Sequence, residues 1–90
     1  MNTDEYEISL NREITVCKNT IQRIQKTLGI LERKHKKTTE AFIAELKSGK
    51  LAQHPEFKDD YEAWQSNYDS LKRWEELEKQ YQDAYRMEKD

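Results

Sequence analysis

The chain has 90 residues, of which 34% are hydrophobic and 38% are charged, and its formal net charge at pH 7 is −2. This composition is too polar for a thick globular core, yet it is poor in the Gly and Pro that mark disordered chains. The near-neutral charge gives no overall field that would select nucleic acid or a membrane surface. The composition therefore predicts one small domain, residues 1–90, built from long helices with solvated outer faces.

Signals for export or membrane insertion are not evident in the sequence. No apolar run approaches the roughly 20 residues needed to cross a bilayer. The segment MNTDEYEISL is acidic, whereas a signal peptide begins with basic residues followed by an apolar core. The single cysteine provides no disulfide framework. We therefore expect a cytoplasmic protein that has no membrane partner.

The first third of the chain carries an unbroken heptad pattern. Its apolar positions are separated by alternating steps of four and three residues, which places them on one seam of a helix. The members of this seam are Leu10, Ile14, Cys17, Ile21, Ile24, Leu28 and Leu31, with His35 next. No proline interrupts the pattern, so it predicts a helix over about residues 4–36.

A short second helix is predicted over about residues 39–48. Thr38 and Thr39 each offer a side-chain oxygen to cap its start, and Gly49 is the residue type that most often ends a helix. A helix of this length is marginal alone in water, so we expect it to dock on the rest of the chain. The side chains expected to make that contact are Phe42 and Leu46.

A third helix is predicted over about residues 55–87, with Pro55 in its first turn, where the missing N–H costs nothing. Its apolar positions recur at helical spacing and are rich in aromatic residues. They are Phe57, Tyr61, Trp64, Tyr68, Leu71, Trp74, Leu77, Tyr81 and Ala84. Aromatic rows of this kind are more often core than ligand sites, and Trp and Tyr are also the usual anchors of protein interfaces.

Two long helices joined by a short one predict an all-α, antiparallel, coiled-coil-like helical hairpin. The charges favour this pairing, because residues 18–37 carry seven Lys or Arg and one Glu, whereas residues 56–75 carry six acidic and three basic side chains. A lone hairpin would barely offset its ordering entropy. We therefore expect a homo-oligomer, most simply a dimer forming a four-helix bundle, or a protein partner that supplies the missing face.

The basic run before the short helix has two interpretations. Arg33, Lys34, Lys36 and Lys37 are candidate phosphate contacts, which would make the chain a nucleic-acid-binding accessory protein. Cations at a helix C-terminus also complement the helix dipole, and the run lacks interleaved aromatic residues. We favour the dipole interpretation, and nucleic acid remains the alternative partner. Whether the helix breaks within this run is open at the sequence level.

Candidate catalytic or metal-binding groups are sparse. His35 lies on the seam, where a hydrogen-bonded histidine is commoner than a ligand, and Cys17 is favoured as a small core residue. Adding His54 to these residues does not produce a recognised zinc spacing. A thin hairpin offers no obvious pocket for paired carboxylates. We expect no enzymatic activity, no cofactor and no metal.

The middle of the chain resembles a group of short helical bacterial and archaeal proteins that are often encoded beside toxin genes. In that group a coiled-coil arm runs into a Lys-Tyr-Gly-Met-Thr-like turn, followed by acidic residues with a phenylalanine, a Gly-Glu-Leu and an acidic stretch leading to tryptophan. The resemblance covers about residues 32–68. The matching segments are Lys34 to Thr38, Glu40 with Phe42, Gly49-Lys50-Leu51, and Asp59 to Trp64.

The sequence departs from this group at the turn, where His35-Lys36-Lys37 stands in place of Tyr-Gly-Met. The loss of glycine leaves the backbone geometry of the turn open. The resemblance implies an antitoxin-like protein that binds a partner such as a toxin, and it implies no catalytic residue. The favoured function is thus a protein–protein interaction module, with a self-assembling scaffold as a further alternative. The residues expected in the partner surface or the bundle core are Phe42, Leu46, Phe57, Trp64 and Trp74.

Overall fold

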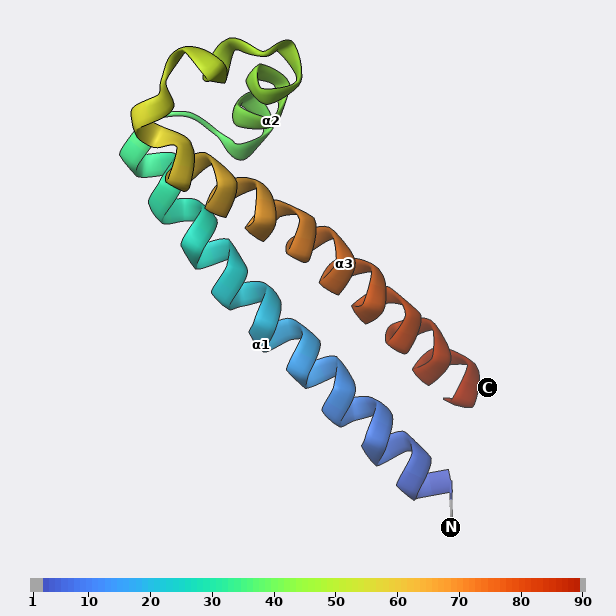
Figure 1. Ribbon diagram of the computed structural model, residues 1–90. Coiled ribbons are helices and arrows are strands. Elements are labelled where there is room, and N and C mark those ends of the chain that lie inside the picture. Colours follow the sequence, from blue (N-terminus) through green and yellow to red (C-terminus); the bar gives the residue numbers. More distant parts are fainter. Residues whose placement is uncertain (1–2, 90) are drawn as a thin grey trace.

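The structure is a computed structural model that describes residues 3–89. It confirms the predicted all-α hairpin with a short helix at its turn (Figure 1). The long helices α1 (Thr3–His35) and α3 (Lys58–Lys89) are the two arms, and α2 (Thr39–Ser48) lies at their closed end. The hairpin measures 60 × 20 × 16 Å, so it is only about two helices thick. No helix within residues 3–89 has the length and apolar character of a membrane span.

The predicted heptad seam of α1 is the buried side of that helix. All seven apolar members, from Leu10 to Leu31, are buried. Two contacts fix the antiparallel register: Tyr81 Oη donates a hydrogen bond of 3.1 Å to Glu13 Oε2, and His35 Nε2 lies 2.9 Å from Asp60 Oδ2. Residues whose numbers add to about 95 therefore lie at the same level of the hairpin.

The helix breaks inside the basic run, which answers the question that the sequence left open. Lys36 has a φ of 54°, in the left-handed region that side chains other than glycine rarely adopt. The backbone N–H of Lys37 then donates to the carbonyl oxygen of Glu32 at 3.1 Å, the six-to-one bond of a Schellman helix stop. Lys36 therefore takes a backbone conformation that glycine adopts without strain.

The start and end of α2 follow the predicted signals. Thr38 is the N-cap, and its hydroxyl oxygen accepts a hydrogen bond of 3.1 Å from the backbone N–H of Ala41. Gly49, with a φ of 82°, closes the helix by donating its N–H to the carbonyls of Glu45 and Leu46. The two threonines thus have different roles, because Thr39 is buried and does not serve as the cap.

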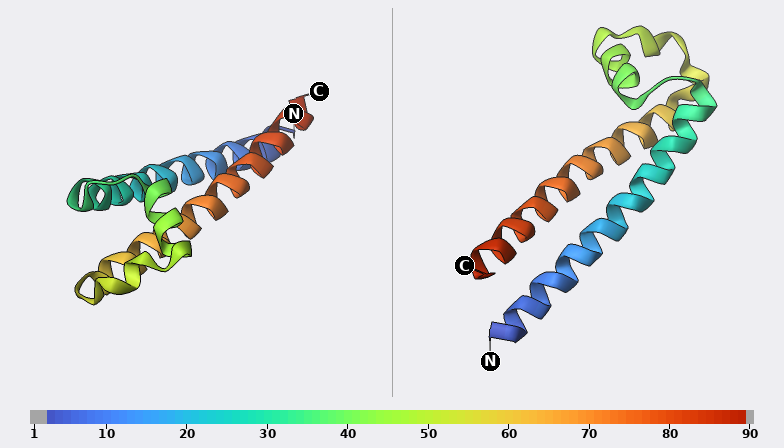
Figure 2. Two further views of the ribbon diagram at one scale, coloured as in Figure 1. Left: turned by 90° about the horizontal axis from the view of Figure 1, so that it is seen from above. Right: turned by 180° about the vertical axis from the view of Figure 1, so that it is seen from behind.

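The connector from α2 to α3 consists of two 3-10 turns, Lys50–Gln53 and Pro55–Phe57. The third helix therefore begins at Lys58 and not at Pro55 as expected. Pro55 still fits the first position of its turn. Seen from above in Figure 2, α2 lies over the line between the two arms at their closed end. A cluster of buried hydrophobic side chains lies there; it comprises Ile24, Leu28, Leu31, Phe42, Leu51 and Trp64.

Candidate functional site

The centre of the closed end is a stacked aromatic pair. Phe42 of α2 and Trp64 of α3 lie parallel, with ring centroids 4.2 Å apart and an interplanar angle of 1°. Both side chains are fully buried. Of the two roles expected for them, the structure places both rings in the core of the hairpin itself, out of reach of a partner. Their stacking anchors α2, which is too short to be stable alone.

A buried polar chain links the three helices around this pair. The indole N–H of Trp64 donates to Thr39 Oγ1 at 2.9 Å, and that hydroxyl donates in turn to Glu32 Oε2 at 2.9 Å. The backbone N–H of Thr39 donates to the same carboxylate oxygen at 2.8 Å. A buried Trp N–H needs an acceptor, and here Thr39 supplies it. Sequence reasoning missed this network; the signal was Glu32, the lone acid in a basic segment.

His35 is the predicted hydrogen-bonded seam histidine. Its imidazole lies edge-on to Phe57, with ring centroids 5.0 Å apart, and donates to Asp60 Oδ2 at 2.9 Å. The same oxygen accepts a bond of 2.7 Å from Lys34 Nζ. The hydrogen bond from Lys34, and second that from His35, lowers the pKa of the Asp60 carboxyl below its ordinary value. This cluster joins the C-terminus of α1 to the start of α3.

The candidate phosphate contacts do not form one free basic patch. Lys34 is paired with Asp60, and Lys37 Nζ lies 2.7 Å from Glu45 Oε1 on α2. Arg33 and Lys36 are exposed. Since two of the four cations already face carboxylates of the same chain, the run has less charge to offer a nucleic-acid backbone than its sequence implies.

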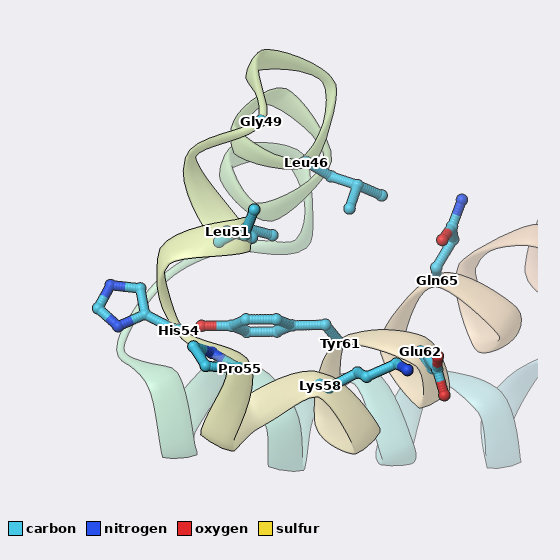
Figure 3. A pocket seen from close by; sticks show the side chains of 10 residues that line it. Leu46, Gly49, Leu51, His54, Pro55, Lys58, Tyr61, Glu62 and Gln65 are labelled. Carbon is cyan, nitrogen blue, oxygen red and sulfur yellow. The ribbon is translucent and has the colours of Figure 1, made fainter.

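A mainly apolar groove of about 380 Å³ lies between the connector and α3. Figure 3 shows Leu46 and Leu51 on the wall formed by α2 and the connector, facing Tyr61 and Gln65 of α3. Leu46, one of the predicted site residues, is half-buried here and also packs against the core cluster. A groove of this size and lining has room for one or two apolar side chains.

The α3 arm beyond Trp64 carries large side chains that are less covered than the α1 seam beside them. One row points along the side that meets α1, but each of its members is only half-buried. The row comprises Tyr68, Leu71, Trp74, Leu77 and Tyr81. Trp74 still packs against the core cluster, while Val16 and Ile30 of α1 are exposed. We call the five residues Tyr68, Leu71, Trp74, Leu77 and Tyr81 the α3 row.

The free cysteine and the side chains able to bind metal ions lie as follows in the described residues 3–89. Cys17 is buried, and desolvation first, then the nearby Glu78, raises the pKa of its thiol and keeps it protonated. Across residues 3–89, no cluster of three or more His, Cys, Asp or Glu side chains has the geometry to hold a metal ion. The structure offers two surfaces for contact with other molecules, a half-buried aromatic row and an apolar groove.

No known family model, curated protein or solved structure matches the chain. Four of the five predicted site residues gather at the closed end, with Phe42 and Trp64 buried and Leu46 and Phe57 at its margin. Trp74 lies apart from them, near the middle of the α3 row.

Proposed function

We propose that the chain is a non-enzymatic protein–protein interaction module that acts by burying the α3 row in a protein partner. One observation carries the proposal. The seam of α1 is buried along its length, whereas the α3 row that packs beside it is only half-buried. Large aromatic and aliphatic side chains stabilise a fold in proportion to the apolar area they remove from water. A further protein surface over this row would supply the missing burial.

The closed end supports the same proposal in another way. The segments that resemble the toxin-adjacent proteins, within residues 32–68, contain the Thr38 cap, the Phe42–Trp64 stack and the Gly49 stop. These residues build the cap of the hairpin. An antitoxin-like role, with a toxin as heterologous partner, rests on that resemblance.

Site-specific photo-crosslinking in the cell tests the proposal. The photoreactive amino acid p-benzoylphenylalanine replaces Trp74, which it resembles in size, or Gln80, which is exposed on the same helix. Irradiation is expected to link the Trp74 position to a protein and to leave the Gln80 position unlinked. The adduct mass separates a second copy of the 10.9 kDa chain from another protein. If neither position, or both equally, gave an adduct, the proposal would be wrong.

A further inference from the structure

The two ends of the hairpin carry opposite charge. With the register found above, the middle level of the molecule passes near residues 21 and 74. The closed half, residues 22–73, holds eleven Lys or Arg and eight Asp or Glu, a formal charge of +3. The open half, residues 3–21 with 74–89, holds five basic and nine acidic side chains, a formal charge of −4. The hairpin is therefore a long electric dipole with a positive closed end.

The order of residue types in the α3 row is palindromic about the same level. Read in either direction, it presents the order Tyr, Leu, Trp, Leu, Tyr, with Trp74 at its centre. A twofold axis through Trp74 and perpendicular to α3 would bring Trp74 of two copies together. It would also place Leu71 opposite Leu77, whereas Tyr68, six residues before Trp74, and Tyr81, seven residues after it, would lie at the two margins of the contact. Such self-complementarity is what an isologous twofold interface requires.

We propose that the α3 row is covered by a second copy of this chain running antiparallel, with the twofold axis at Trp74. This inference rests on the proposed function and names the occupant of its surface. In this arrangement the +3 half of each copy lies beside the −4 half of the other. A parallel pair would set like charges side by side over the 60 Å length of the hairpin. Charge complementarity of this kind selects one orientation over the other.

Distances between spin labels distinguish the two orientations. Ala44 is exposed in the cap and Asn11 is exposed near the open end, so each is changed to Cys in a Cys17→Ala background and labelled. In the antiparallel dimer, two Ala44→Cys labels are expected about one hairpin length, 60 Å, apart. Mixed Ala44→Cys and Asn11→Cys copies are expected to give a short distance, comparable to the 20 Å width.

The opposite pattern, a short distance between two Ala44→Cys labels, would overturn the antiparallel inference and leave the proposed function standing. A chain that stays monomeric in the same samples would also overturn the inference. The proposed function would then still be decided separately by crosslinking in the cell. Failure of the inference and failure of the function are thus told apart.

A mixing experiment tests the residue pairs themselves. Leu71→Glu and Leu77→Lys are each expected to abolish assembly, because each homodimer would bury charges against leucine. Mixing the two variants in an antiparallel pair places one Glu beside one Lys and one Leu beside one Leu, so assembly is expected to return. In a parallel pair each residue meets its own position and mixing restores nothing. Helix content by circular dichroism shows whether each variant folds before and after mixing.

Discussion

Replacing Thr39 by Val probes the buried polar chain with almost no change of shape. The hydroxyl accepts from the fully buried indole N–H of Trp64 and donates to Glu32. Valine leaves the indole without an acceptor, which costs about 1–3 kcal/mol, whereas Glu32 keeps the backbone N–H of residue 39. For a 90-residue chain each kcal/mol corresponds to a fall in Tm of about 4–8 °C.

The assay is chemical or thermal unfolding at one fixed protein concentration, because assembly makes Tm depend on concentration. Thr39→Ser keeps the hydroxyl, so most of the stability is expected to remain. Thr27→Val is the matched control, since Thr27 Oγ1 only donates to the Arg23 carbonyl within α1; its effect is expected to stay within about 0.5 kcal/mol.

A double-mutant cycle with Trp64→Phe isolates the link between the two side chains. Once the indole is gone, Thr39→Val no longer strands a donor, so the two changes are expected to be non-additive by about 0.5–3 kcal/mol. Additive effects, or a Thr39→Val protein as stable as the Thr27→Val control, would refute the role given to this network.

Three further predictions concern the turn and its charges. Lys36→Gly is expected to raise the free energy of unfolding by about 1 kcal/mol, because Lys36 is held at a φ of 54°. Lys36→Ala is the control, and it is expected to show no such gain. Equal unfolding midpoints for the two variants would contradict this prediction. Folding lowers the pKa of Asp60, so the stabilising contribution of its carboxylate is present above the unfolded-state pKa of about 3.9 and is lost as pH falls through the lower folded-state pKa. The difference in unfolding free energy between the wild type and Asp60→Asn is therefore expected to shrink in acid. A difference that grows in acid would count against the Lys34–His35–Asp60 cluster. Fluorescence anisotropy with mixed DNA and RNA at low salt is expected to show no binding. An affinity for nucleic acid that falls steeply with salt, and that is lost in Arg33→Glu, would instead establish the nucleic-acid function.

Periodicity was sufficient to predict the arms of the hairpin from the sequence. The α1 seam alternates in steps of four and three without interruption, and each of its apolar members is buried. Thr38 and Gly49 likewise act at the helix ends that their residue types indicate. These features depend on neighbours a few residues away, which the sequence displays directly.

The polar network and the break at Lys36 were beyond sequence reasoning for physical reasons. Trp64 and Thr39 are 25 residues apart, so their hydrogen bond depends on how α2 docks between the arms. Lysine at a positive φ runs against its own backbone preference and is imposed by the surrounding turn. The exposure of Trp74 was also undetermined, because helical spacing does not distinguish a core position from an interface anchor.

Sedimentation velocity over a range of concentrations tests most directly whether the α3 row is covered by a second copy of the chain. The wild-type chain is expected to sediment at twice its 10.9 kDa mass at micromolar concentration. Trp74→Glu is expected to sediment as a monomer, while the exposed control Gln80→Glu, which adds the same charge, remains a dimer. A wild-type monomer that unfolds cooperatively, at a temperature that does not change with concentration, would contradict the assembly of two copies through the α3 row.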